Sequence, residues 1–233
     1  MKPVILPSLL AADPGHLADA IRRAEDSGAD KLHLDMMDGA FVPNLSYGPA
    51  IVELARKTTR LPLSVHLMFV RPDLYAKRFA EAGATTLQIH VESSCEVGAT
   101  LEAIRRFGAE PALVLNPLTP HTAALPYLHL VDECLQMTVF PGYGGQKFMP
   151  EPLPEIRALR RAAAAAGKPD FAIMVDGGID RATIAACAEA GADQFVAGTA
   201  LYSKSDMAAE IRLFRQLASD VWCASTSLPS PRS

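Results

Sequence analysis

Two histidines and two aspartates lie at the ends of short apolar runs, where their side chains could bind one metal ion. His33 and Asp35 stand two residues apart in KLHLD, so on a strand both side chains point to the same face. Burying an imidazole beside a carboxylate costs free energy unless a metal, a proton or a substrate compensates them. His66 in SVHLM and Asp176 in IMVDGG end two further apolar runs. The four residues together predict a site for one divalent ion: Zn, Fe(II), Co or Mn.

A hydrogen-bonded core histidine is the alternative for His33 or His66 taken alone. It does not account for all four residues together.

Glycine-rich segments follow three consecutive apolar runs in the C-terminal part of the chain. They are PGYGGQ (141–146), DGG (176–178) and AGTA (197–200). Glycine allows backbone N–H groups to approach an anion closely. Each segment alone could be an ordinary tight turn, but three in succession favour a phosphate-binding site. The absence of a GK[ST] motif excludes a Walker-type loop.

Eight β-rich runs alternate with amphipathic helical stretches such as LADAIRRAEDSG and LPEIRALRRAAAAAG. The helix-to-strand passages SGADKLHLD, AGATTLQIHVE and AGADQFVAG resemble one another and place Gly28, Gly83 and Gly191 where a helix ends. The predicted strands are Val4–Pro7, Lys31–Asp35, Leu63–Leu67, Thr86–His90, Pro111–Leu115, Glu133–Thr138, Ala172–Val175 and Gln194–Ala197.

Eight βα units favour an α/β fold that closes as a single (β/α)8 TIM barrel. A doubly wound open sheet is the alternative, but no GxGxxG follows the first strand. Pro120 and Pro126 leave room for only a short helix around residues 121–128. We expect the barrel to span residues 1–220 and residues 221–233, rich in Ser and Pro, to be a disordered tail.

Composition limits the possible partners. The chain has 233 residues, 49% of them hydrophobic, and a formal net charge of −4, which argues against nucleic-acid or anionic-membrane binding. No signal peptide or membrane-spanning segment is expected, because prolines interrupt the N-terminal apolar run and no apolar run is long enough. Four widely spaced cysteines are typical of a reduced, cytoplasmic protein.

In a barrel of this kind the active site lies at the carboxyl ends of the strands, and loops seven and eight commonly bind phosphate. Three methionines, Met37, Met68 and Met137, fall at or beside such ends and could form an apolar cap over reacting carbons, or simply fill the core. The remaining histidines show no partner pattern and are assigned to the surface or the core: His16, His90, His121 and His129. His90 is the one open case, because it ends the fourth strand with Glu92 nearby.

With these motifs assembled, the sequence resembles the ribulose-phosphate 3-epimerase family over nearly its whole length. The resemblance runs through LPSLLAAD, HLDMMDGAFVPN, VHLM, LNPLTP, MTVFPGYGGQKF, VDGGI and VAGTALY. One departure is Phe140, where a polar residue such as Asn is more typical before PG.

The resemblance implies a ribulose-phosphate-binding barrel, a role for each motif and a homo-oligomeric assembly. His33, Asp35, His66 and Asp176 would hold the metal, and Asp35 and Asp176 would also act as acid and base. Met37, Met68 and Met137 match the family's methionine cap. The residues implied to bind the substrate are Ser8, His66, Gly142, Tyr143, Gly144, Gly145, Gly177, Gly178, Gly198 and Thr199.

The implied reaction interconverts D-ribulose 5-phosphate and D-xylulose 5-phosphate, a step of the pentose phosphate pathway, by proton transfer at C3 through an enediolate. Asp35 and Asp176, on strands expected at opposite sides of a barrel, could serve the two faces of that carbon. An epimerase of a six-carbon ketose phosphate such as allulose 6-phosphate remains open, because the extra carbon depends on loop shape. A decarboxylase or an aldolase would need a catalytic lysine, and Lys31 lies at the wrong end of its strand. A non-catalytic sugar-phosphate binder would be expected to lack one of the two acids, and both are present.

Overall fold

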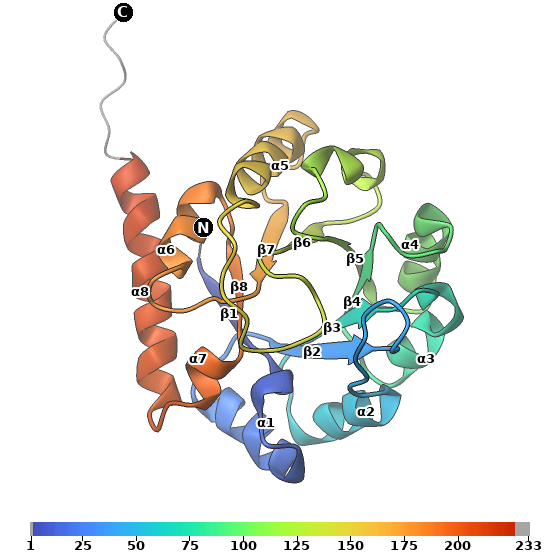
Figure 1. Ribbon diagram of the computed structural model, residues 1–233, viewed down its shortest axis with the longest axis horizontal. Helices are drawn as coiled ribbons and strands as arrows, with labels where there is room; N and C mark the ends of the chain where they lie inside the picture. The colour runs from blue at the N-terminus through green and yellow to red at the C-terminus, as the bar shows by residue number, and fades with distance from the viewer. Residues whose placement is uncertain (1, 227–233) are drawn as a thin grey trace, which may run out of the picture.

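The computed structural model describes residues 2–226 and forms a barrel of parallel strands surrounded by helices (Figure 1). The strand order is β1-β8-β7-β6-β5-β4-β3-β2, and a parallel bridge between Ser8 and His33 links the two edge strands. The strands are β1 Val4–Pro7, β2 Leu32–Met37, β3 Leu63–Met68, β4 Thr86–His90, β5 Glu110–Leu115, β6 Glu133–Met137, β7 Ala172–Asp176 and β8 Gln194–Ala197. The predicted (β/α)8 barrel is confirmed.

Helices connect successive strands on the outside of the barrel. They are α1 Leu17–Asp26, α2 Pro49–Thr58, α3 Ala76–Glu81, α4 Val97–Arg106, α5 Leu153–Ala165, α6 Ile184–Ala190, α7 Thr199–Tyr202 and α8 Met207–Thr226. Between β5 and β6 the crossover consists of two 3₁₀ turns, His121–Ala123 and Leu125–Tyr127, as the prolines there predicted. Further 3₁₀ turns cover Leu9–Ala11, Pro14–His16 and Pro72–Leu74.

Side-chain alternation sorts the strand residues into two buried layers. In β2, Leu32, Leu34 and Met36 belong to the large apolar core that the strands share with the surrounding helices. His33 and Asp35 alternate with them and therefore point into the barrel. A smaller apolar cluster fills the interior; it includes Leu6, Val114, Leu135, Met174 and Val196. The polar side chains of His33 and Asp35 therefore lie next to a packed apolar interior, towards the carboxyl ends of the strands.

The C-terminal helix extends further than the sequence predicts. Helix α8 continues to Thr226, so residues 221–226 are helical and not part of a disordered tail. Trp222 attaches this part of the helix to α6: its indole N–H donates to the Ala188 carbonyl oxygen at 3.0 Å. Residues 227–233 of the expected tail lie outside the described residues.

No helix within residues 2–226 combines the length and the apolar character that crossing a bilayer requires.

Candidate active site

The four predicted metal-ligand residues converge at the carboxyl ends of β2, β3 and β7. One nitrogen or oxygen atom from each of His33, Asp35, His66 and Asp176 lies within 4.8 Å of the other three. Both histidines are fully buried, Asp35 is buried, and the Asp176 side chain is 19% exposed. In the ring of strands, β1 and β8 separate β2 from β7, so the two aspartates flank one site without being diametrically opposed.

The donor atoms are spaced as a small divalent ion requires. His33 Nε2 and His66 Nδ1 each lie 3.2 Å from Asp35 Oδ1, and His33 Nε2 lies 3.8 Å from Asp176 Oδ2. Metal–ligand bonds of about 2.1 Å would separate neighbouring tetrahedral ligands by about 3.4 Å. The donor set is chemically suitable and these three distances are close to that value, so these residues could hold a divalent metal.

Ser8 connects the site to the first strand. It follows β1, caps the 3₁₀ turn Leu9–Ala11, and donates its hydroxyl to Asp35 Oδ2 at 2.7 Å. Since Asp35 Oδ1 faces the two imidazoles, both oxygens of this buried carboxylate have partners. Ser8 thereby fixes the orientation of the Asp35 carboxylate.

The two carboxylates have opposite pKa shifts. Burial raises the pKa of Asp35, but the charge and hydrogen bonds of His33, with those of His66, outweigh burial and hold it well below its usual value. Burial, and then the negative charge of Asp35, raise the pKa of Asp176 to about 7. Without metal, therefore, Asp35 is ionised at neutral pH while Asp176 is partly protonated.

The two histidines also differ. Burial lowers the pKa of His66 to about 4, so its imidazole is neutral at physiological pH, as a metal ligand must be. Burial acts in the same direction on His33, but the Asp35 and Asp176 carboxylates outweigh it and raise the pKa of His33 above the usual value. Metal binding would therefore release protons, and affinity should increase with pH.

Asp176→Asn should stabilise the metal-free protein at pH 8 but hardly at pH 5. A carboxyl group whose pKa rises on folding binds more protons in the native state, so its contribution to stability falls as pH rises from about 4 to 7. Asparagine carries no such penalty. Three pKa units correspond to at most about 4 kcal/mol, and urea denaturation in a chelator at both pH values measures the difference. An equal effect at pH 5 and pH 8 would contradict the raised pKa.

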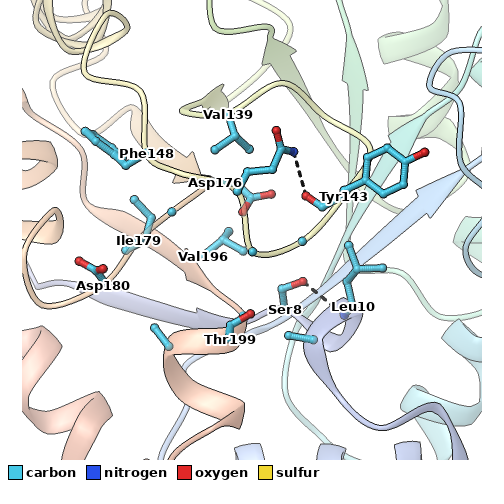
Figure 2. Close-up of a pocket in the computed structure, with 18 of the residues that line it drawn as sticks. Ser8, Leu10, Val139, Tyr143, Phe148, Asp176, Ile179, Asp180, Val196 and Thr199 are labelled. Carbon is cyan, nitrogen blue, oxygen red and sulfur yellow. Dashed lines mark hydrogen bonds between the residues drawn. The ribbon is translucent and has the colours of Figure 1, made fainter.

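A cavity of about 740 Å³ opens at this end of the barrel. Figure 2 shows Ser8, Asp176 and Thr199 arranged around it, on segments that follow β1, end β7 and begin α7. The predicted residues that line it are Ser8, Asp35, Met37, Met68, Met137, Gly142, Tyr143, Gly144, Gly145, Asp176, Gly177, Gly178, Gly198 and Thr199. His33 and His66 are fully buried and are not among its lining residues.

Two consecutive glycines after β7 allow the backbone there to approach the segment that follows β6 more closely than any residue with a Cβ would allow. Gly177 and Gly178 have φ of +123° and +65°. A Cβ on Gly177 would lie 2.7 Å from the Val139 nitrogen, and one on Gly178 would lie 2.6 Å from the Phe148 nitrogen. The loop after β7 therefore packs directly against the backbone that follows β6.

The segment after β6 crosses the barrel mouth in Figure 1 and is attached to the loop after β2. Tyr143 donates its hydroxyl to the Pro43 carbonyl oxygen at 2.7 Å, and the Asn44 amide donates to the Gly142 carbonyl oxygen at 2.7 Å. Phe140, the residue that departs from the family pattern, is 49% exposed and is not among the residues that line the cavity.

The three methionines are 2–3% exposed and line the cavity beside the two aspartates. Such polarizable, apolar side chains can cover the carbon atoms of a bound sugar and exclude water.

The structure extends the site beyond the residues that the sequence predicts. His90, assigned to the core or the surface, is fully buried, and its Nε2 lies 2.8 Å from His66 Nε2. Its Nδ1 lies 3.2 Å from Oε2 of Glu92, the nearby acid that left His90 an open case. Residues two apart share a face of a strand, so the His-x-Glu spacing indicates this pair, but not the contact with His66.

Cationic side chains near the cavity were also missed: Lys147, Arg181 and Lys204. Arg181 is engaged by Glu210, through hydrogen bonds of 2.8 and 2.5 Å.

Comparison with known proteins relates this sequence to ribulose-phosphate 3-epimerases. Residues 4–202 match the ribulose-phosphate 3-epimerase family. A ribulose-phosphate 3-epimerase of Bacillus subtilis is 45% identical over 87% of this chain and 93% of its own length. The Synechocystis enzyme of the same name is 43% identical over 89% and 91%.

Solved structures share the fold at much lower identity. The crystal structure of KGPDC from Streptococcus mutans superposes with a TM-score of 0.68 at 16% identity, covering 95% of this chain and 100% of the other. The tryptophan synthase α subunit of Legionella pneumophila gives a TM-score of 0.60 at 18% identity, with 94% of each chain covered. These likenesses support the barrel architecture.

Proposed function

The chain belongs to the ribulose-phosphate 3-epimerase family, and from this premise we propose that it interconverts D-ribulose 5-phosphate and D-xylulose 5-phosphate. These two ketoses differ only in configuration at C3, next to the C2 carbonyl group. Inversion requires removal of the C3 proton on one face and delivery of a proton on the other. The intermediate is an enediolate whose negative oxygen must be stabilised.

The observation that carries this proposal is the convergence of two carboxylates, Asp35 and Asp176, beside two buried histidines at one end of the cavity. In one direction, ionised Asp35 removes the C3 proton and protonated Asp176 delivers its own to the opposite face; in the other direction the roles exchange. A divalent metal held by His33, Asp35, His66 and Asp176 would act as a Lewis acid that stabilises the negative charge developing on the substrate oxygens.

The remaining lining residues suit the two ends of a ketose phosphate. Ser8 orients Asp35 and reaches the substrate side of the site. The glycine segments and Thr199 would present backbone N–H groups and a hydroxyl to the phosphate. Met37, Met68 and Met137 would cover the carbons between them. This assigns the sugar to the strand ends and the phosphate to the loops that follow β6, β7 and β8.

Three finer points complete the proposal. The metal is Zn, Fe(II), Co or Mn, since imidazole and carboxylate ligands suit all four. The enzyme works in the cytoplasm, in keeping with its bacterial relatives. It assembles as a homo-oligomer.

Incubation of the metal-reconstituted protein with D-ribulose 5-phosphate in D₂O tests the reaction directly. We expect xylulose 5-phosphate that carries deuterium at C3, because the proton delivered comes from a carboxyl group that exchanges with solvent. NMR follows both the loss of the C3 proton signal and the appearance of the second epimer.

A protein that neither exchanges nor inverts C3 with any of the four metals would contradict the five-carbon assignment. Six-carbon ketose phosphates would then be the next substrates, since an additional hydroxymethyl group leaves the C3 chemistry unchanged.

A further inference from the structure

We propose that Glu92, acting through His90, holds His66 in the tautomer whose Nδ1 lone pair faces the metal site. Both would be positioning residues, because neither lines the cavity and each acts through His66. The inference rests on the metal site of the proposed function and adds an outer hydrogen-bond chain to it.

The chain of contacts runs from the metal site to the end of β4. His66 Nδ1 faces Asp35, while its other nitrogen, Nε2, lies 2.8 Å from His90 Nε2. His90 Nδ1 lies 3.2 Å from Glu92 Oε2. Both imidazoles are fully buried, and the Phe41 ring packs against His90 with ring centroids 4.5 Å apart. In this enclosed position, protein groups determine where the ring protons lie.

Glu92 fixes the direction of the chain at its outer end. Its Oε1 accepts hydrogen bonds from the Asn116 backbone N–H at 3.0 Å and from the Thr119 hydroxyl. Its Oε2 is thus left for His90, and an ionised carboxylate can only accept. His90 must therefore carry a proton on Nδ1. In a neutral imidazole its Nε2 is then an acceptor.

This acceptor determines the tautomer of His66. Only one proton fits between two nitrogens 2.8 Å apart, so it must belong to His66 Nε2 and be donated to His90. His66 Nδ1 is then unprotonated and can bind a metal. Asp35 Oδ1, 3.2 Å from Nδ1, would draw a proton onto that nitrogen when no metal is bound, and the Glu92 chain opposes this.

Glu92→Gln should reverse the direction of the hydrogen bonds that link Glu92, His90 and His66, with little change in side-chain shape. If the glutamine oxygen keeps the Asn116 and Thr119 hydrogen bonds, its NH₂ group faces His90 Nδ1 and requires that nitrogen to accept. His90 Nε2 then donates to His66, and the His66 proton moves to Nδ1, where it blocks the metal. The opposite amide orientation would place NH₂ against the Asn116 N–H, which would lose its acceptor.

Zinc affinity, measured by competition with a chromophoric chelator, should fall about 10- to 100-fold in Glu92→Gln. Thr119→Val is the first control, because it removes one hydrogen bond to Glu92 but leaves a carboxylate facing His90. Glu133→Gln is the second: it makes the same change at an acid buried within the barrel, which binds Lys31 and accepts from Gln88 and Gln194. Both controls should bind zinc as wild type does.

The ring ¹⁵N shifts of histidine-labelled, zinc-loaded wild-type protein test the direction of the chain without any substitution. We expect protons on His66 Nε2 and His90 Nδ1. A proton on His90 Nε2 instead, or a loss of affinity in Thr119→Val as large as in Glu92→Gln, would overturn the inference. Unchanged zinc affinity in Glu92→Gln would overturn this inference but leave the proposed metal site standing. Failure of the wild type to bind zinc would overturn both.

Discussion

Asp176→Asn is expected to lower kcat for epimerisation by at least about 10³-fold, near the upper end of what a general acid–base group contributes. Asparagine cannot deliver or remove a proton, and one of the two faces of C3 then has no catalyst. Asp176 also belongs to the metal-competent cluster, which adds to the loss. The measurement is initial velocity for ribulose 5-phosphate and xylulose 5-phosphate, with the metal content of each preparation determined alongside.

Single replacement of either acid should separate proton exchange from inversion. In D₂O, Asp176→Asn should still exchange the C3 proton of one epimer, the one whose proton faces Asp35, without forming the other epimer. Asp35→Asn should show the same behaviour with the opposite epimer. This crossed pattern is specific to two bases that serve two faces, and a structural defect would suppress both exchanges equally.

Exchange of both epimers by the same single variant would contradict the two-base assignment. It would mean that one group, or a water molecule, reaches both faces of C3. The proposed roles of Asp35 and Asp176 would then have to be replaced by a single base beside them.

The eight strands could be predicted to within about two residues because each is a short apolar run bounded by glycine, proline or charge. Gly191 illustrates the helix boundaries: it has φ of +108° and ends α6, as the repeated helix–glycine–strand passages predicted. The extension of α8 could not be predicted in this way. There Trp222 contacts a carbonyl of α6 that lies 34 residues away in the sequence, and such a contact leaves no local pattern.

In the site, too, contacts between residues close in the sequence could be predicted, and contacts between distant residues could not. His33 and Asp35 could be found from the sequence because a strand places residues two apart on one face. The contact between His90 and His66 could not be found in this way, because the two residues lie 24 positions apart on neighbouring strands and no sequence period links them. The pKa contrast between Asp35 and Asp176 also depends on three-dimensional placement, since burial and the charge of Asp35 raise one while the two histidines lower the other.

Gly178→Ala should destabilise the protein by about 3 to 5 kcal/mol and raise KM for the sugar phosphate. The residue adopts φ of +65°, and an added Cβ would lie 2.6 and 2.8 Å from the nitrogen and Cα of Phe148. These are backbone atoms, so no side-chain rotation relieves the contact. One of the two loops must move, and both loops line the proposed phosphate site.

Gly144→Ala is the matched control in the same cavity. A Cβ at Gly144 would meet nothing within 4 Å, and its φ lies outside the positive range, so stability should hardly change. Thermal or urea unfolding of the two variants isolates the backbone clash, while KM and kcat show whether the loop after β7 holds the phosphate. If Gly178→Ala kept both wild-type stability and wild-type KM, the close packing of Gly178 on Phe148 would have no role in the site. If only stability fell, the glycine would serve the fold, and the phosphate would have to be held by the loops that follow β6 and β8.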